Sequence, residues 1–242
     1  MKTVVLCGGF GTRIRDVAED IPKPMIPVGN FPILWHILKY YASFGHKESV
    51  LCLGYKGTVI KDFFLNYESH TRDFTVQLGG KEPIKYHNEN DESDWQVTLA
   101  ETGQNAMTGA RVRRIKKYVA DDENFFLTYG DGVGDVDLTE LLNFHIKHGR
   151  ILTVTGVRPP GRFGELNCNG EGCVTEFNEK PQASGGLISG GFFVCRKELF
   201  DYLPKGEDLV FEQDPMRNLV RDNQLMVFEH RGFWQPMDTY RD

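Results

Sequence analysis

The chain has 242 residues, of which 40% are hydrophobic, 12% aromatic and 26% charged, and this ordinary globular composition excludes a disordered, collagen-like or low-complexity protein. Lys and Arg number 28 against 34 Asp and Glu, so the net charge is −6, which argues against a dedicated nucleic-acid or anionic-membrane surface. We therefore expect no nucleic-acid partner and no membrane partner, although a local basic pocket is compatible with this balance.

The first part of the chain alternates between strand and helix patterns. A continuous apolar run closed by Gly8 and Gly9 is typical of a strand buried on both faces, and Pro32 and Gly45 bound a helical pattern. Such alternation predicts right-handed crossovers and a mainly parallel sheet. The patterns in chain order are strand 4–7, helix 32–44, strand 49–53 and helix 59–67.

The rest of the chain continues with further strand and helix patterns and one hairpin pattern, without an internal repeat or a linker. Strand patterns cover 74–78, 84–87, 96–100, 125–129, 151–157, 191–195 and 225–229, and a hairpin is predicted over 166–177. Helical patterns cover 109–119, 138–148, 198–203 and 215–222. We therefore expect an α/β fold in one domain over 1–242: a Rossmann-like, mainly parallel, twisted sheet flanked by helices, with a smaller irregular β-rich portion.

A glycine-rich turn follows the first strand, at the edge where ligands of open α/β sheets bind. Residues 6–13 read Leu-Cys-Gly-Gly-Phe-Gly-Thr-Arg, which matches neither the dinucleotide-binding GxGxxG fingerprint nor a Walker P-loop. Glycines let backbone N–H groups approach phosphate oxygens, and Arg13 can grip a phosphate with two donors. A tight turn with a surface arginine is an equally good interpretation of these residues alone.

Lys23 lies between two prolines in the segment Pro22-Lys23-Pro24-Met25. Because prolines fix φ and favour extended backbone in the residue before them, the lysine is expected to be held stiffly near the same end of the sheet. A lysine in a proline-rich surface loop is the alternative.

The five cysteines are odd in number and scattered, and no CxxC pair occurs. This indicates neither a disulfide framework nor a zinc site, and reduced thiols fit a cytoplasmic protein. The apolar run 4–7 is too short for a signal peptide, and no stretch of about 18 apolar residues occurs elsewhere. We therefore expect a cytoplasmic location.

Taken together, GGxGTR at 8–13 and PKPM at 22–25 resemble the signature of sugar-1-phosphate nucleotidyltransferases, and the similarity covers nearly the whole chain. Further matching segments are YGDG at 129–132, EKP at 179–181, GGF at 190–192 and FWQPMDT at 233–239. The segment 102–111 is similar to that of the family's cytidylyltransferases, and the central stretch of its thymidylyl- and uridylyltransferases is missing. Ser189 and Glu165 depart from the family pattern in the sugar half.

The resemblance implies transfer of a cytidylyl group from CTP to α-D-glucose 1-phosphate, giving CDP-glucose and pyrophosphate, with Mg²⁺ as cofactor. It also implies a mainly nucleotide-binding half over 1–158 and a mainly sugar-binding and metal-completing half over 159–242. Two alternatives stay open: another sugar 1-phosphate or phosphorylated polyol as acceptor, and a non-catalytic nucleotide-sugar-binding protein. Arg13, Lys23, Asp131 and Asp238 argue against the binding protein, because such a protein needs neither a metal nor positive charges at the α-phosphate.

In this family CDP-glucose feeds deoxysugar synthesis, usually for cell-surface polysaccharide such as lipopolysaccharide O-antigen. Relatives form hexamers, so the resemblance implies a homo-oligomer. It also implies that a terminal helix that helps assembly is missing after Asp242.

The resemblance also implies roles for individual residues. It implies that the catalytic residues are Arg13, Lys23 and Asp131. It implies that the nucleotide is bound by Leu6, Cys7, Gly8, Gly9, Gly11, Thr12, Arg13, Lys23, Thr108, Arg111 and Gly130. It implies that the sugar phosphate is bound by Tyr129, Glu179, Lys180 and Gly191. Mg²⁺ is expected between Asp131 and Asp238, and only the family pattern brings these two aspartates together.

Two other groups of residues have simpler interpretations. A basic run occupies Arg111, Arg113, Arg114, Lys116 and Lys117, and helical spacing spreads it around a solvated face. Arg111 is the exception, because it follows the Thr108-Gly109 turn. The histidines at 36, 145 and 148 lack metal-binding spacing beside acidic or cysteine ligands and are expected to be structural.

Overall fold

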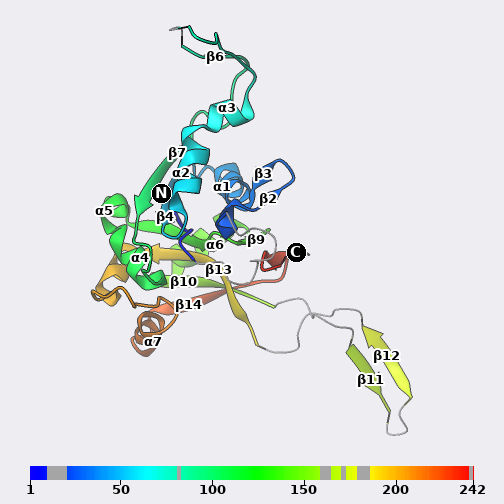
Figure 1. The fold of residues 1–242 in the computed structure, drawn as a ribbon. Helices are drawn as coiled ribbons and strands as arrows, with labels where there is room; N and C mark the ends of the chain where they lie inside the picture. Colours follow the sequence, from blue (N-terminus) through cyan, green and yellow to red (C-terminus); the bar gives the residue numbers. More distant parts are fainter. Residues whose placement is uncertain (10–20, 81–82, 159–164, 170–172, 179–185, 240–241) are drawn as a thin grey trace.

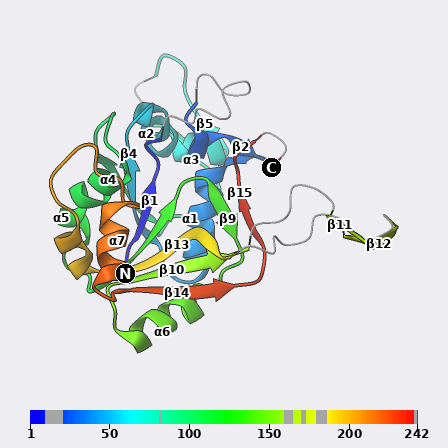
Figure 2. The same ribbon diagram turned by 90° about the horizontal axis from the view of Figure 1, so that it is seen from below.

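A seven-stranded sheet forms the centre of the computed structural model (Figure 1), which describes residues 1–9, 21–80, 83–158, 165–169, 173–178, 186–239 and 242. The strand order is β14-β10-β13-β8-β1-β4-β7, and β14, β10 and β13 follow one another in Figure 2. The strands are β1 (Thr3–Leu6), β4 (Glu48–Leu53), β7 (Gln96–Glu101), β8 (Asn124–Tyr129), β10 (Leu152–Val157), β13 (Ile188–Arg196) and β14 (Leu225–His230).

Most neighbouring strands of this sheet run parallel. The pairs β1–β4, β1–β8, β4–β7 and β10–β14 are parallel, and β13 alone runs antiparallel to its neighbours β8 and β10. The predicted mainly parallel α/β sheet is therefore confirmed. Because β8, β1 and β4 lie side by side and point the same way, their carboxyl ends meet at one edge of the sheet.

Helices cover both faces of the sheet, as predicted. They are α1 (Ile33–Ser43), α2 (Gly57–Leu65), α3 (Tyr67–Thr71), α4 (Thr108–Arg114), α5 (Lys116–Val119), α6 (Leu138–His148), α7 (Asp214–Arg221), and the 3₁₀ turns η1 (Lys23–Met25) and η2 (Lys197–Tyr202). Val4 packs in one core with residues of α4, α5, η2 and α7. Val5 packs in another with residues of α1 and α2, and α6 joins α1 in a third around Phe126. Alternate residues of β1 thus face opposite layers.

The helix α1 ends as its sequence predicts. Gly45 has φ of 86°, and its N–H donates to Ala42 O while the His46 N–H donates to Tyr41 O. These two bonds satisfy carbonyls at the end of the helix and form a Schellman motif, which requires the left-handed conformation that glycine adopts without strain.

Several predicted helices differ in the structure. The helix predicted over 59–67 begins at Gly57 and breaks at Asn66, whose side-chain amide donates to Asp62 O and competes with the helical backbone. The helix predicted over 109–119 breaks at Ile115, although its buried side chain continues the apolar pattern. The segment predicted as helix 198–203 is the 3₁₀ turn η2. Apolar periodicity alone does not detect such breaks.

The small strands also differ from the prediction. Those predicted over 74–78 and 84–87 shorten to β5 (Phe74–Thr75) and β6 (Lys85–Tyr86), and the hairpin of β11 (Glu165–Cys168) and β12 (Val174–Asn178) is confirmed. This hairpin lies apart from the sheet in both views (Figures 1 and 2). The sequence patterns missed two pairs: β2 (Pro27–Val28) with β3 (Phe31–Pro32), and β9 (Gly132–Gly134) with β15 (Trp234–Pro236).

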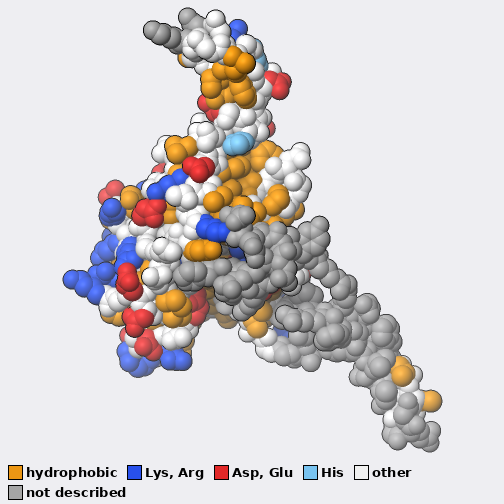
Figure 3. Space-filling model, in the orientation of Figure 1, with side chains coloured by type: hydrophobic (Ala, Val, Ile, Leu, Met, Phe, Trp, Pro, Cys, Tyr) orange, Lys and Arg blue, Asp and Glu red, His pale blue; other side chains and the backbone are white. Residues whose placement is uncertain are grey.

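Within the residues that the structure describes, no helix combines the length and the apolar character needed to cross a membrane. The basic side chains beyond Arg111 lie on the outer side of α4 and α5, where Figure 3 shows Lys and Arg interspersed with Asp and Glu. Arg114, for example, pairs with Glu207 at 2.8 Å. The prediction of a solvated face for this run is confirmed.

Candidate functional site

A pocket of about 440 Å³ opens at the carboxyl ends of β1 and β8. Its walls come from the turn after β1, the 3₁₀ turn η1, the start of α4, the end of β8 and the segment after β15. The lining residues are Leu6, Cys7, Gly8, Gly9, Lys23, Pro24, Ala106, Met107, Thr108, Arg111, Tyr129, Gly130, Asp131 and Asp238. The structure therefore brings together most of the described residues that the sequence singled out.

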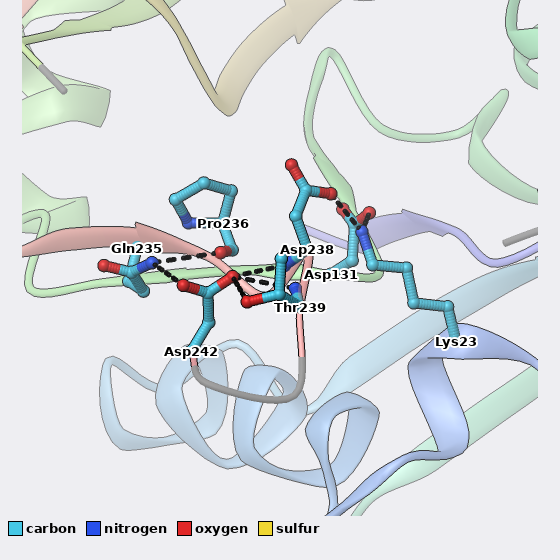
Figure 4. Close-up of polar contacts among 7 residues, drawn as sticks. All are labelled: Lys23, Asp131, Gln235, Pro236, Asp238, Thr239 and Asp242. Carbon is cyan, nitrogen blue, oxygen red and sulfur yellow. Dashed lines mark hydrogen bonds and ion pairs between the residues drawn. The ribbon is translucent and has the colours of Figure 1, made fainter. Parts of the chain in front are cut away.

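Lys23 and two aspartates form the polar centre of this pocket. The ammonium of Lys23 donates to Asp131 Oδ2 and to Asp238 Oδ1, each at 2.6 Å (Figure 4). The Lys23 side chain is 12% exposed, whereas those of Asp131 and Asp238 are 37% and 30% exposed. Two carboxylates thus converge on one cation, and both stay accessible from the pocket.

The β9–β15 ribbon explains why the two aspartates meet. Gly132, next to Asp131, pairs with Pro236, and the Met237 N–H donates to Asp131 O at 2.8 Å. Beyond the ribbon, Asp242 Oδ2 accepts from the backbone N–H groups of Asp238 and Thr239, at 3.1 and 2.8 Å (Figure 4). The backbone that carries Asp238 is therefore fixed from both sides.

The position of Lys23 differs from the expectation. Lys23, Pro24 and Met25 form η1, closed by the Met25 N–H donating to Pro22 O, so Lys23 is not extended. Proline disfavours the helical region in the preceding residue without forbidding it. Burial lowers the pKa of Lys23, but the charges and hydrogen bonds of Asp131 and Asp238 outweigh it and raise the pKa above its ordinary value. The side chain is therefore a cation at neutral pH.

Arg111 is a second cation of the pocket, and its side chain is buried, with the residue 4% exposed. Its guanidinium holds together the turn after β1, the end of β4 and the loop after β7, donating to Gly8 O, Leu53 O, Thr102 Oγ1, Gly103 O and Gln104 O. Among the described residues it forms no ion pair with a carboxylate. Burial is the main cause that lowers the pKa of Arg111 from its ordinary value.

Replacing Gly8 with alanine is expected to destabilise the fold by about 2 kcal/mol, because overpacking a filled site costs roughly this much. A Cβ at Gly8 would lie 2.2 Å from Arg111 Cζ, and the hydrogen bonds of the buried guanidinium oppose its retreat. Urea unfolding of both variants measures the effect, with Gly9→Ala as the control, since a Cβ there meets nothing within 4 Å. Equal stability of the two variants would contradict this role of Gly8.

The other predicted contact residues take several positions. Gly130 donates its N–H to Leu6 O, which joins β8 to β1 at the floor of the pocket. Gly191 does not line the pocket: with φ of 77° it packs against the ring of Tyr129, and a Cβ there would lie 2.4 Å from Tyr129 Cδ2. Gly11, Thr12, Arg13, Glu179 and Lys180 lie outside the described residues.

One residue at the pocket rim was missed by the sequence patterns. Glu212 accepts a hydrogen bond from Thr108 Oγ1 at 2.7 Å and another from Tyr129 Oη. No motif contains Glu212, and its partners are 104 and 83 residues away in the chain, so nothing local indicates these contacts.

Three cysteines and one histidine are buried in the described part of the chain. Cys7, Cys52 and Cys195 are buried free thiols, and burial raises the pKa of Cys7, so this pocket thiol stays neutral. His145 is buried between Thr153 Oγ1 and Asn124 Oδ1, which confirms its expected structural role, and burial lowers its pKa to about 4.

Comparisons with known proteins show similarity over the whole chain. The family model described as "Nucleotidyl transferase" matches residues 2–239. A glucose-1-phosphate cytidylyltransferase of Salmonella typhimurium is 46% identical over 242 residues, which are 100% of this chain and 93% of that protein. A probable glucose-1-phosphate cytidylyltransferase of Bacillus subtilis is 43% identical with the same coverage. The crystal structure of HddC from Yersinia pseudotuberculosis has a TM-score of 0.68 at 21% identity, over 99% of this chain and 95% of that one, and this likeness shows the fold alone.

Proposed function

Since the chain belongs to the nucleotidyl transferase family, we propose that it transfers a cytidylyl group from CTP to α-D-glucose 1-phosphate, giving CDP-glucose and pyrophosphate. The observation that carries this proposal is the convergence of Lys23, Asp131 and Asp238 in the pocket at the carboxyl ends of β1 and β8. A pocket that gathers two carboxylates and two cations at the carboxyl edge of the sheet suits a triphosphate with its counter-ion.

The reaction is an in-line displacement at the α-phosphorus of CTP. A phosphate oxygen of glucose 1-phosphate forms the new P–O bond, and the bond from the α-phosphorus to the bridging oxygen breaks, so that pyrophosphate leaves with that oxygen. The attacking oxygen is already anionic and needs no general base. The protein therefore works by positioning the two substrates and by neutralising the charge of the phosphates.

Lys23 and Arg111 supply positive charge on two sides of the pocket. Lys23 bears a fixed ammonium beside the aspartates, where it can offset the charge that builds at the α-phosphate. Arg111 donates to Gly8 O and so holds the backbone of Gly8 in place in the pocket wall. Gly8 and Gly9 carry no side chain, which leaves room for close approach of phosphate oxygens.

The two aspartates have the donor chemistry that Mg²⁺ requires. Mg²⁺ is usually bound by one or two carboxylates together with phosphate oxygens and waters. Asp131 Oδ2 and Asp238 Oδ1 already point at one cation, and no group of three or more His, Cys, Asp or Glu side chains gathers among the described residues. A bound Mg²⁺ would act as a Lewis acid that polarises the phosphate. Asp131 and Asp238 would hold it.

The purified protein is expected to prefer CTP over UTP and dTTP by about 10²-fold or more in kcat/KM, because a wrong base leaves a buried polar group unpaired. The expected source of this selectivity is the early glycine loop together with the segment 102–111, rather than the sugar half. The segment 102–111 contributes Ala106, Met107 and Thr108 to the pocket. Pyrophosphate release with each nucleotide and glucose 1-phosphate measures it. Comparable turnover of the three nucleotides would contradict it.

The same assay with a panel of sugar 1-phosphates and phosphorylated polyols tests the acceptor. Highest kcat/KM with glucose 1-phosphate supports the proposal, whereas a different preferred acceptor favours the first alternative. Binding of CDP-glucose without pyrophosphate release from any pair would favour a non-catalytic binding protein. The homo-oligomer and the cytoplasmic location stay predictions.

A further inference from the structure

Glu212 lies between η2 and α7, at the rim of the pocket, and its carboxylate joins two of the pocket walls. Thr108 is the first residue of α4, and Tyr129 is the last residue of β8. Each donates its hydroxyl proton to a different oxygen of the same carboxylate, Thr108 to Oε2 and Tyr129 to Oε1. One side chain thus links the start of a helix to the end of a strand.

Both hydroxyl groups are oriented by this contact. Thr108 Oγ1 accepts from the Phe211 N–H at 2.9 Å while it donates to Glu212, so the position of its proton is set. The Tyr129 ring packs between Phe193, at 5.9 Å between centroids, and the backbone of Gly191. Burial, followed by the charge of Glu212, raises the pKa of Tyr129 well above its ordinary value, so the phenol remains a donor.

The backbone before Glu212 is fixed along α4. The Met107 N–H donates to Glu207 O at 2.8 Å, and the Ala110 N–H donates to Leu209 O at 3.1 Å. A Cβ at Gly109 would lie 2.8 Å from Leu209 Cγ, so the two segments are in close contact. The backbone of residues 207–209 is therefore held against α4, and this places Glu212 near the pocket independently of the contacts of its exposed side chain.

We propose that Glu212 is a positioning residue for the transfer reaction, acting through Thr108 and Tyr129; this inference rests on the proposed function. The helix that begins at Thr108 carries Arg111, and the strand that ends at Tyr129 leads through Gly130 to Asp131. By holding both hydroxyls, the carboxylate keeps α4, which carries Arg111, at a fixed distance from the end of β8, which leads to Asp131, the proposed Mg²⁺ ligand.

Replacing Glu212 with alanine is expected to lower kcat about tenfold or more, as for a lost charge-assisted hydrogen-bond pair, with little change in KM for CTP. Glu212→Gln keeps one acceptor but loses the charge and turns an amide donor toward the second hydroxyl, so it is expected to recover only part of the activity. Asp208→Asn removes a neighbouring exposed charge that is not among the residues lining the site pocket; it is the matched control, expected to behave as the unchanged protein.

A double-mutant cycle tests the route of action. If Glu212 acts through the two hydroxyls, Glu212→Ala is expected to have less than about a twofold effect in a Thr108→Val, Tyr129→Phe background. Additive losses would overturn the proposal, and so would a melting temperature that falls in step with activity across the variants. Nonadditive losses of activity, with melting temperatures that do not follow the activity, support the proposal.

The assay distinguishes this inference from the proposed function. The unchanged protein is assayed first, and the variants are compared on whichever nucleotide and sugar phosphate it turns over best. If it turns over no pair, the proposed function fails, and amide hydrogen exchange of residues 107–114 decides about Glu212. Faster exchange in Glu212→Ala than in Asp208→Asn supports the link between the walls, and equal exchange overturns it.

Discussion

Replacing Lys23 with alanine is expected to lower kcat by on the order of 10²-fold or more, with a much smaller change in KM for CTP. The ammonium would meet negative charge that develops chiefly in the transition state, so its loss affects the chemical step more than substrate binding. The structure places this ammonium 2.6 Å from both Asp131 and Asp238, and their charges keep its pKa above the ordinary 10.5. The group is therefore expected to stay charged throughout the neutral range.

The raised pKa also gives the sign of a stability effect. Because the folded protein holds the Lys23 proton more tightly than the unfolded chain, this stabilisation is fully present below the unfolded pKa and is lost as pH rises through the folded value. Alkaline unfolding of Lys23→Met is expected to show less of this loss than the unchanged protein.

Initial-rate kinetics of Lys23→Ala and Lys23→Met measure the catalytic effect, and melting temperatures check that both variants fold. Lys147→Ala removes an exposed lysine of α6 and is the control for loss of one positive charge. A rise in KM with unchanged kcat would make Lys23 a binding residue and would overturn the assigned role.

Replacing either Asp131 or Asp238 with asparagine is expected to lower the rate by on the order of 10²-fold and to raise the Mg²⁺ concentration needed for half-maximal activity. A Lewis-acidic metal contributes several kcal/mol to charge stabilisation, and each 1.36 kcal/mol corresponds to about tenfold in rate. The two carboxylates are 37% and 30% exposed, so a metal that enters with the nucleotide can reach them.

Titration with Mg²⁺ and Mn²⁺ measures this effect in each variant. Mn²⁺ binding in the presence of CTP, followed by electron paramagnetic resonance, provides a readout that does not depend on turnover. Asp121→Asn changes an exposed aspartate outside the pocket and controls for the loss of one charge. Near-normal rates with an unchanged metal requirement would remove the affected aspartate from the metal site.

Local signals in the sequence predicted the elements whose boundaries depend on neighbouring residues. The helix α6 covers 138–148 as predicted: the Asp137 side chain accepts from the Thr139 and Glu140 N–H groups, and Gly149 ends the helix with φ of 65°. The buried strands β1 and β8 follow from short apolar runs that end at glycines. Caps and periodicity act within a few residues, so they can be read directly from the chain.

Only part of the candidate site could be predicted from local signals in the sequence. The glycine-rich turn and the lysine between prolines indicated phosphate chemistry, and the family resemblance added the aspartates. Lys23 is nevertheless 108 and 215 residues from its partners Asp131 and Asp238. Their meeting depends on the β9–β15 ribbon, whose strands are three residues long and leave little pattern.

The sequence by itself thus determined most of the longer strands and helices, and which residue types stand at the carboxyl edge of the sheet. Only the tertiary structure decided that Arg111 is buried against Gly8 and that Glu212 bridges Thr108 and Tyr129. The reason is physical: hydrogen bonds of caps and turns join neighbours in the chain, whereas these contacts form only after the packing of the sheet has brought distant segments together.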